Sequence, residues 1–287
     1  MSDSKTLLLI DGHAVAYRAF FAIRNLSRSD GVPTNAVYGF IRMLEQMRQQ
    51  WKPSHVCVVF DGGLAQERMD LLPEYKQQRE PMPDDLRVQF DFINRFLSAS
   101  GIHVELLEDQ EADDVMATIA VGAASTGDVL IATSDKDMLQ LVQDRIWIIP
   151  PTKSENRMGV QEVTGKTGVR PDQIAAWLAL IGDTADNIGG VPGVGPKTAA
   201  KWLQTWDHLE GILSHREELP TRFAEVLLSH RDVVIRNLAM TTLKLDLPVG
   251  CDWNRWEVRP NNSDLLAFFK EMEFKSMAQA LESPSLF

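Results

Sequence analysis

The chain has 287 residues, with 29 Lys and Arg against 40 Asp and Glu, which gives a formal net charge of −11. Its 44% of hydrophobic and 24% of charged residues are typical of a globular protein with one large core, or with a core and a smaller satellite domain. This composition excludes a disordered chain, a collagen-like chain and a small disulfide scaffold. No apolar run reaches the roughly 20 residues that span a bilayer. The two cysteines, Cys57 and Cys251, favour a reducing compartment, so we expect a cytoplasmic protein without a membrane partner.

A net charge of −11 ordinarily argues against a nucleic-acid partner. The acidity is local, however, because nine of the acids fall in short motifs at the ends of predicted elements. Without these nine negative charges the net charge would be −2, which is close to neutral. The nine residues are Asp11, Asp61, Glu111, Asp113, Asp114, Asp135, Asp137, Asp183 and Asp186.

In the first half of the chain, short apolar runs alternate with helical patterns. This alternation predicts an α/β fold in which a mostly parallel sheet carries helices on both faces. The predicted strands are residues 6–10, 55–60, 102–107, 128–133 and 146–149. The predicted helices are residues 35–50, 84–100, 112–124 and a short one at 137–142.

After about residue 151 the strand signal disappears and helical patterns continue to residue 274. We therefore expect a first domain of residues 1–155 and an all-helical lobe of residues 156–287. Inside the first domain, residues 62–83 form a long irregular connection, and such connections are usually functional. Because this connection has few large apolar residues, we expect it to be mobile.

The acidic residues of the first domain fall where predicted strands end. Asp11 and Asp61 directly follow strands, and Asp135 comes two residues after another. Carboxyl ends of parallel strands lie at one edge of a sheet, where ligands of open α/β sheets bind. Any one of these residues could simply cap the next helix. A gathering of like charges instead predicts a cation site, and a set of oxygen donors without His or Cys favours Mg²⁺ or Mn²⁺ over zinc.

The second half adds two acids and a glycine-rich string. Asp183 and Asp186 are three residues apart, which would place both on one face if the stretch is helical. Residues 190–200 read GVPGVGPKTAA, which predicts a helix–hairpin–helix. Its glycines would admit a nucleic-acid backbone, and its helix start would bind a phosphate. The alternative is a Gly-Pro turn between core helices with solvated lysines.

The connection at residues 62–83 carries cations at helical spacing. Lys76 and Arg79 are three residues apart, and Arg68 lies about three helical turns before Arg79. A cationic helix above an acidic edge would provide counter-charge for a phosphodiester. The alternative is that these are solvated surface charges.

Together these motifs resemble the 5′→3′ exonuclease and flap endonuclease family, in the bacterial form found at the N-terminus of DNA polymerase I. The resemblance covers nearly the whole chain. It implies a PIN-like or resolvase-like nuclease core (1–155), a helical arch at about 62–85, and a helix–hairpin–helix, or helix–three-turn–helix, at about 182–204. The motifs that carry it are Leu9-Ile-Asp-Gly-His-Ala14, Tyr17-Arg-Ala-Phe-Phe21, Val59-Phe-Asp61, Tyr75-Lys-Gln-Gln-Arg79, Glu111-Ala-Asp-Asp-Val115, Ser134-Asp-Lys-Asp137, Gly182-Asp-Thr-Ala-Asp-Asn187 and Gly193-Val-Gly195.

The resemblance also implies the roles of individual residues. The nine acids would hold two Mg²⁺ ions, which Mn²⁺ can replace, and Tyr17 would stack on a base. The catalytic set would be Asp11, Asp61, Lys76 and Arg79. Potassium would bind the backbone carbonyls of Leu180, Ile181, Gly189, Val191 and Val194. DNA contacts would come from Tyr17, Arg18, Arg68, Lys76, Arg79, Gly193, Gly195, Lys197, Thr198 and Lys201.

The implied activity is a structure-specific 5′→3′ exonuclease and 5′-flap endonuclease in replication and repair. It would hydrolyse DNA, and primer RNA, by a two-metal mechanism that leaves 5′-phosphate and 3′-hydroxyl ends. The expected substrates carry 5′ flaps, nicks or free 5′ ends, and the expected state is a monomer that works with a DNA polymerase. Two alternatives stay open: a PIN-type ribonuclease, and a catalytically silent module that binds DNA junctions.

Overall fold

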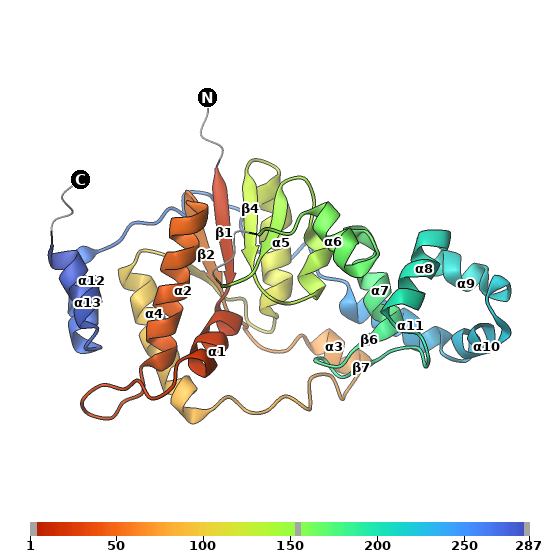
Figure 1. Ribbon diagram of the computed structural model, residues 1–287, viewed down its shortest axis with the longest axis horizontal. Helices are drawn as coiled ribbons and strands as arrows, with labels where there is room; N and C mark the ends of the chain where they lie inside the picture. The colour runs from red at the N-terminus through yellow and green to blue at the C-terminus, as the bar shows by residue number, and fades with distance from the viewer. Residues whose placement is uncertain (1–4, 153–155, 284–287) are drawn as a thin grey trace.

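A five-stranded parallel sheet forms the centre of the N-terminal domain (Figure 1). The structure, a computed structural model, describes residues 5–152 and 156–283. The strand order β3-β2-β1-β4-β5 places β1 in the middle, where Leu9 pairs with Cys57 on one side and Ile131 on the other. The strands are β1 (Thr6–Asp11), β2 (His55–Val59), β3 (His103–Glu105), β4 (Asp128–Ala132) and β5 (Ile146–Ile149).

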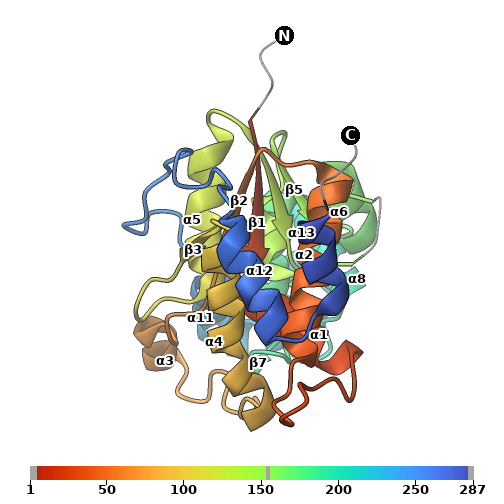
Figure 2. The same ribbon diagram turned by 90° about the vertical axis from the view of Figure 1, so that its left-hand side faces the viewer.

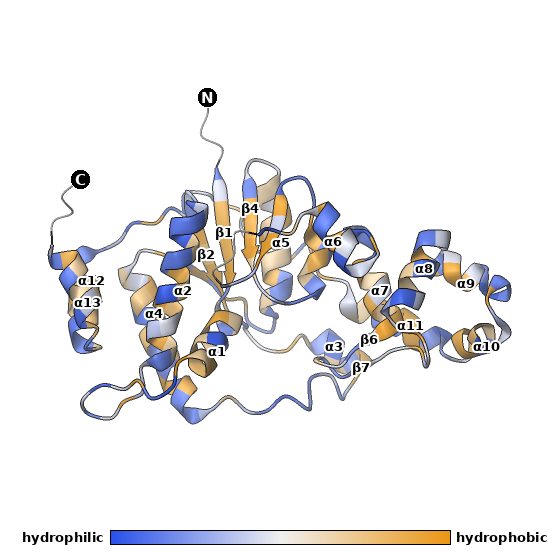
Figure 3. Ribbon diagram, viewed as in Figure 1, coloured by the Kyte–Doolittle hydropathy of each residue, from blue (hydrophilic) through white to orange (hydrophobic). Residues whose placement is uncertain are grey.

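Side chains of β1 alternate between two buried faces. Leu7 and Leu9 pack into the core under α5, whereas Leu8 and Ile10 pack into the core under α1, α2 and α4. A strand covered on both faces needs a continuous apolar run, which explains why β1 does not alternate apolar with polar residues. Figure 3 shows the resulting apolar centre with hydrophilic outer helix faces. The helices are α1 (Gly12–Ala22), α2 (Asn35–Trp51), α4 (Asp84–Ala99) and α5 (Ala112–Ala124).

The predicted sheet is confirmed, with differences at its edges. The strand expected at 102–107 is a three-residue edge strand, and Leu106, which follows it, is half exposed. The helix expected at 137–142 is a 3-10 helix, η1 (Asp137–Leu141). The helix α1 was not predicted.

The second part of the chain is a helical lobe that extends from the α5 side of the sheet (Figure 1). Within the lobe, α7 packs against α11. None of the described helices has the length and apolarity needed to cross a membrane. The elements are α6 (Val160–Thr167), η2 (Pro171–Gln173), α7 (Ile174–Ile181), β6 (Gly182–Asp183), β7 (Ile188–Gly189), α8 (Pro196–Trp206), α9 (Leu209–Ser214), η3 (Arg216–Glu218), α10 (Thr221–Ser229) and α11 (Arg231–Thr241).

The last two helices do not belong to the helical lobe, although residues 156–287 were expected to form it. The helices α12 (Asn262–Glu271) and α13 (Lys275–Glu282) lie against α4 and α2 of the first domain (Figure 2). The ring of Phe96 lies 6.1 Å from that of Phe268 and 6.3 Å from that of Phe269. The sequence shows that these helices are amphipathic, but the face that they cover depends on tertiary packing.

Residues 62–83 form the irregular connection that was expected, but their cations do not lie on one helix. A short helix, α3 (Gln66–Leu71), is followed by turns, and Lys76 has a left-handed backbone with φ of 56°. Lys76 and Arg79 therefore do not share a helical face. We call residues 62–83 the arch segment below.

Candidate metal centre and nucleic-acid interface

Three aspartates gather at the carboxyl edge of the sheet, as predicted. Asp11 ends β1, while Asp61 and Asp135 follow the strands on either side of it. All three also accept hydrogen bonds from backbone amides, and Asp135 does so from the N–H of Asp137 at 2.9 Å. The Asp11 carboxylate accepts from the N–H of Ala14 at 2.8 Å, and that of Asp61 accepts from the N–H of Ala112 at 2.8 Å. Hydrogen bonds to backbone amides and the gathering of the three carboxylates at one edge thus occur together, and the cation site stays a prediction.

Burial and mutual repulsion raise the pKa of several carboxylates near this edge. Burial, with added repulsion from Asp61 and Asp135, raises the pKa of Asp11 to about 7. Burial and repulsion from Asp135 and other neighbours raise the pKa of Asp137 to about 8. The pKa of Asp113 is raised by burial and by the same negative neighbours. Each shift marks a place where a positive charge would be stabilised.

The donor atoms fit a hard divalent cation. Oδ1 of Asp137 and Oε1 of Glu111 are buried and have no hydrogen-bond partner. A buried acceptor without a donor is costly, and a cation removes that cost. Within the described residues, no three acidic, His or Cys side chains converge closely enough to hold an ion in this arrangement. The carboxylates are therefore gathered at one place without being closed around a common point.

Asp183 and Asp186 lie on a hairpin, so the expectation that they share a helical face is wrong. Asp183 ends β6 and Asp186 lies in the turn before β7, and both are buried. Gly182 has a φ of 79°, and a Cβ there would meet the carbonyl oxygen of Ile188 at 2.5 Å. The tight hairpin directs both carboxylates toward the edge of the sheet, where each interacts with Asp135 and Asp137.

The cations of the arch segment rest on two of these acids. Lys76 Nζ donates to Glu111 Oε2 at 2.7 Å, and Arg79 Nη2 donates to Asp186 Oδ1 at 2.7 Å. The hydroxyl of Tyr75 lies between them, at 3.0 Å from Glu111 and 3.1 Å from Asp186. Lys76 is buried, whereas half of the Arg79 side chain is exposed. The sequence motif contains Tyr75 but does not indicate that its hydroxyl bridges two acids.

Backbone contacts also tie the arch segment to the hairpin. The N–H of Lys76 donates to the carbonyl of Asp186 at 3.1 Å, and the Asn187 amide donates to the carbonyl of Glu74 at 2.8 Å. The amide of Gln78 donates to two carbonyls of the hairpin turn. The arch segment is thus packed and hydrogen-bonded in this structure, contrary to the expectation from its low apolar content.

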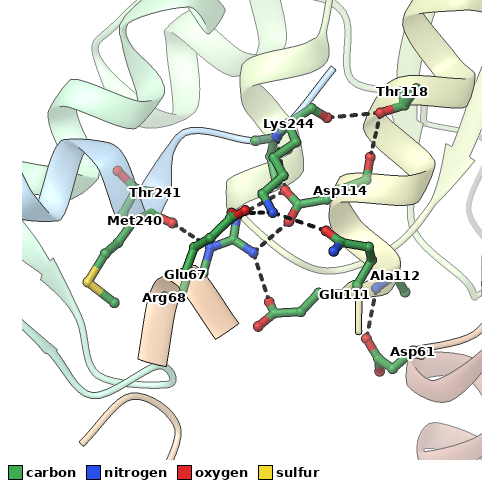
Figure 4. A network of polar contacts seen from close by, with 12 residues as sticks. Asp61, Glu67, Arg68, Glu111, Ala112, Asp114, Thr118, Met240, Thr241 and Lys244 are labelled. Atoms are coloured by element: carbon green, nitrogen blue, oxygen red, sulfur yellow. Dashed lines mark hydrogen bonds and ion pairs between the residues drawn. The ribbon is translucent and has the colours of Figure 1, made fainter. Parts of the chain in front are cut away.

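Arg68 and Asp114 do not occupy the positions expected of them (Figure 4). Arg68 is only 5% exposed and forms a two-pronged ion pair with Asp114, at 2.7 and 2.9 Å. Asp114 is fully buried by this pair. Arg68 therefore faces the protein interior rather than a DNA surface, and Asp114 faces Arg68 rather than the other carboxylates.

Aromatic side chains line the wall of the cavity opposite the arch. A cavity of about 650 Å³ is bordered by the acidic edge, by Lys76 and Arg79, and by Tyr17 and Phe21 of α1. The rings of Tyr17 and Phe21 lie 6.4 Å apart. Arg18 is exposed on the same helix. His13 lies within the cavity as well; its Nδ1 accepts from the N–H of Asp61 at 3.2 Å, a contact that the sequence motif did not reveal.

The predicted helix–hairpin–helix residues surround the start of α8. Gly193 has a φ of 78°, which only glycine adopts readily, and Gly195 precedes the first turn of α8. A Cβ at Gly195 would meet no atom within 4 Å, so this surface is open to a ligand backbone. One face of α8 lines a hollow of about 540 Å³ that contains two indoles and a phenylalanine ring, and the α8 side chains in its wall include Lys197, Thr198 and Lys201.

The five carbonyls proposed for potassium lie around the same hairpin. Three of them already accept a hydrogen bond: Leu180 from Val191 N, Gly189 from Asn237 Nδ2, and Val191 from Val194 N. A carbonyl oxygen has a second lone pair, so these bonds leave room for a cation. Potassium binding by these residues, together with Ile181, stays a prediction.

Family models match the chain in two adjoining pieces. The "5'-3' exonuclease, N-terminal resolvase-like domain" matches residues 6–168, and the "5'-3' exonuclease, C-terminal SAM fold" matches residues 169–264. The resolvase-like core with a following helical lobe is therefore confirmed. The second match ends inside α12, whose remaining residues pack on the first domain.

Two groups of relatives resemble the chain over almost all of its length. A protein from Aquifex aeolicus named 5'-3' exonuclease is 36% identical over 280 residues, covering 97% of this chain and 96% of the relative. DNA polymerase I of Bacillus subtilis is 36% identical over 291 residues, covering 99% of this chain but 33% of the relative. The chain thus spans about one third of the length of the polymerases that it matches.

Solved structures share the same fold at lower identity. A bacteriophage T5 flap endonuclease solved with DNA and metal ions has a TM-score of 0.68 at 20% identity, covering 97% of this chain and all of the other. The catalytic core of Rad2 in complex with a DNA substrate has a TM-score of 0.65 at 14% identity, covering 97% and 93%. With its acidic sheet edge, its arch segment and two adjoining domain matches from residue 6 to residue 264, the chain belongs to the 5'-3' exonuclease family.

Proposed function

We propose that the protein is a structure-selective 5′→3′ exonuclease and 5′-flap endonuclease that leaves 5′-phosphate and 3′-hydroxyl ends. The observation that carries this proposal is the composition of one cavity. Carboxylates of the sheet edge, the cations Lys76 and Arg79, and the aromatic rings of Tyr17 and Phe21 all border it. A strand of nucleic acid presents phosphates to cations and bases to aromatic rings, and it matches this arrangement.

Two Mg²⁺ ions, replaceable by Mn²⁺, would be held by the carboxylates at the sheet edge and the hairpin. Bound there, they would lower the pKa of a water molecule and stabilise charge on the phosphoryl oxygens. Asp114 differs from the other eight acids, because its carboxylate is paired with Arg68. The remaining ligands are Asp11, Asp61, Glu111, Asp113, Asp135, Asp137, Asp183 and Asp186.

The residues of the chain itself account for the orientation of substrate. Lys76 and Arg79 now neutralise Glu111 and Asp186, and both cations would exchange these carboxylates for the phosphate next to the cut. The Tyr17 ring, on α1 across the cavity, would stack on the adjacent base. Arg18, exposed on the same helix, would contact a neighbouring phosphate.

The start of α8 would hold the duplex beside the cut. Backbone N–H groups near Gly193 and Gly195, with Thr198, Lys197 and Lys201, would bind phosphates without reading bases. A potassium ion on the hairpin carbonyls would add positive charge at the same place. Binding of this kind selects the shape of the substrate and tolerates any sequence.

The cellular setting follows from the same chemistry. The substrates would be DNA with 5′ flaps, nicks or free 5′ ends, and primer RNA, in replication and repair. Both cysteines are unpaired, which agrees with a reducing cytoplasm. We expect a monomer that acts beside a DNA polymerase, whether in the same chain or in another.

A cleavage assay on matched, 5′-labelled substrates tests the proposal. With Mg²⁺ we expect cutting of a flap and a nicked duplex, short products with 3′-hydroxyl ends, and much slower cutting of single-stranded RNA. Asp135→Asn, purified in parallel, excludes a contaminating nuclease. Binding of flaps without turnover in Mg²⁺ or Mn²⁺ would indicate a silent junction-binding module, and a preference for single-stranded RNA would indicate a ribonuclease.

A further inference from the structure

Beside the cavity lies a buried polar cluster that joins three parts of the molecule (Figure 4). Arg68 comes from α3 at the base of the arch segment, Asp114 and Glu111 come from the start of α5, and Lys244 lies just after α11. We call these four residues the Arg68 cluster. It is separate from the wall of the cavity, because Arg68 and Asp114 do not border it.

The hydrogen-bonding capacity of Asp114 is taken up by the protein. Oδ2 accepts from Arg68 Nη1 at 2.7 Å, while Oδ1 accepts from Arg68 Nη2 at 2.9 Å and from the N–H of Lys244 at 3.0 Å. Its neighbour Asp113 differs, since it borders the cavity together with Asp11 and Asp135. A carboxylate with three charge-assisted or backbone donors and no exposed surface has no need of a metal ion.

The donors of Arg68 are equally committed. Besides its two bonds to Asp114, Nε donates to the carbonyl of Met240 at 3.0 Å, and Nη1 reaches Glu111 Oε2 at 3.2 Å. Glu111 is the acid that also accepts from Lys76 at 2.7 Å, and its other oxygen has no partner. Arg68 therefore fixes one oxygen of Glu111 and leaves the second oxygen free for another ligand.

The end of the helical lobe is attached to the same cluster. Lys244 Nζ lies 2.5 Å from Glu67 Oε2 on α3 and 3.0 Å from Gln110 Oε1, just before α5. Its carbonyl accepts from Thr118 Oγ1 at 3.1 Å. Through these contacts the cluster joins the arch segment, the helix that carries Glu111, and the chain that leaves the lobe.

We propose that Asp114 is not a metal ligand and that Arg68 is not a DNA contact: the pair is a positioning element that holds Glu111 and the base of the arch segment in register. This inference rests on the proposed function. Arg68 acts through Glu111 and through α3, because without its guanidinium group neither Glu111 nor α3 is held in place by this cluster. Lysine cannot replace it, since a single ammonium cannot bind Asp114 with two parallel bonds and also reach Glu111.

Metal binding without substrate tests the assignment of Asp114. Mn²⁺ is titrated calorimetrically into the full chain and into Asp114→Asn, with Asp135→Asn as the comparison. We expect Asp114→Asn to keep the same number of Mn²⁺ ions with Kd changed less than about threefold. Asp135→Asn should weaken Mn²⁺ binding by about tenfold or more, as loss of a group at a metal site does. Equal weakening, or loss of an ion in Asp114→Asn, would overturn the proposal.

Amide hydrogen exchange and single-turnover kinetics test the role of Arg68. In Arg68→Gln and in Arg68→Lys, amides of residues 66–79 should exchange faster. Cleavage of a flap should slow by about tenfold or more, with the duplex Kd nearly unchanged. The double variant Arg68→Gln/Asp114→Asn should be no worse than the worse single variant, since the two residues act as a unit. A salt-dependent loss of duplex affinity with normal cleavage at saturation would make Arg68 a DNA contact instead.

These outcomes separate the inference from the proposed function. If the full chain cuts no substrate at all, the proposed function fails while the Mn²⁺ titration and the exchange data still decide the roles of Asp114 and Arg68. If Arg68→Gln does not fold, Asp114→Asn keeps the volume of the side chain and decides the assignment alone.

Discussion

The acidic edge of the sheet and the arch segment face each other across one cavity, yet different forces set their conformations. Asp11 is placed by strand β1, whose apolar residues are fully buried on both sides. Lys76 is placed by polar contacts to Glu111 and Asp186, on a backbone with a left-handed turn. Burial of apolar strands therefore fixes one wall of the cavity, and ion pairs with hydrogen bonds fix the other.

This difference predicts how each wall responds to change. The sheet edge persists when a carboxylate is altered, because strand packing does not depend on it. The arch segment depends more on charges, since its apolar contacts are few: Ala65 and Tyr75 are buried, and Met69 and Leu72 are only partly so. Substitutions at the edge should therefore remove chemistry and keep the fold, whereas substitutions in the arch should change both chemistry and local order.

The largest expected effect is at the sheet edge itself. Asp135→Asn should lower single-turnover flap cleavage on the order of 10³-fold, since one ligand of a metal site supplies several kcal/mol of charge stabilisation. Flap binding and the melting temperature should stay near those of the full chain. Asp91→Asn, at an exposed acid of α4, is the matched control and should cleave normally. Normal turnover by Asp135→Asn would remove the sheet edge from the chemistry.

The next effect is on the opposite wall. Lys76→Ala removes a buried ammonium that lies 2.7 Å from Glu111, and cleavage should slow on the order of 10²-fold, the cost of one preorganised charge contact. Arg79→Ala should cost less because half of that side chain is exposed. Substrate affinity should change little in either variant, since neither substitution alters the duplex contacts proposed for α8.

A control from the helical lobe distinguishes the two arch cations from general surface charge. Lys166→Ala, at an exposed lysine of α6, should match the full chain in both rate and affinity. A Lys76→Ala protein that binds the flap poorly but cuts at the normal rate once saturated would show that Lys76 only docks the substrate.

The same division explains what the sequence could predict. Asp11, Asp61 and Asp135 were located because each follows a strand whose apolar run is legible in the sequence, and a parallel sheet brings strand ends together. The sequence includes Asp183 and Asp186 in the acidic set, but their spacing of three does not distinguish a helix from the tight hairpin that the structure shows. The packing of α12 on α4 was missed because amphipathicity does not name a partner.

Arg68 and Asp114 show the limit more sharply. An arginine suits a DNA contact and an aspartate suits a metal ligand, so residue type alone favours those roles. The structure instead pairs the two side chains with each other at 2.7 Å. Burial of a charge is invisible to composition and spacing, because it depends on what the rest of the chain brings alongside. The cost of burying a charge is met here by a partner 46 positions away in sequence.

A smaller effect is expected at the hydroxyl that bridges the two walls. Tyr75→Phe removes the hydrogen bonds to Glu111 and Asp186 and keeps the ring that packs against Ile188 and Met240. Loss of these bonds should lower the free energy of unfolding by about 1–3 kcal/mol and slow cleavage by roughly tenfold. Thermal unfolding and single-turnover rates on one preparation test this. An unchanged rate with lowered stability would confine Tyr75 to the fold.

The smallest effect is expected far from the cavity, where the fold itself should not respond. Gly195→Val adds a side chain in open space on an extended backbone, with φ of −100° at the residue that precedes α8. Its melting temperature should therefore match that of the full chain, and cleavage of a short single strand should be preserved. Duplex affinity should fall about fivefold, since one backbone hydrogen bond to a phosphate contributes about 1 kcal/mol. Gly190→Val is the contrasting variant, because its Cβ would lie 2.2 Å from the Ile181 carbonyl carbon and the hairpin would have to move. If Gly195→Val bound a nicked duplex as tightly as the full chain in a fluorescence titration, the start of α8 would not be where the duplex rests.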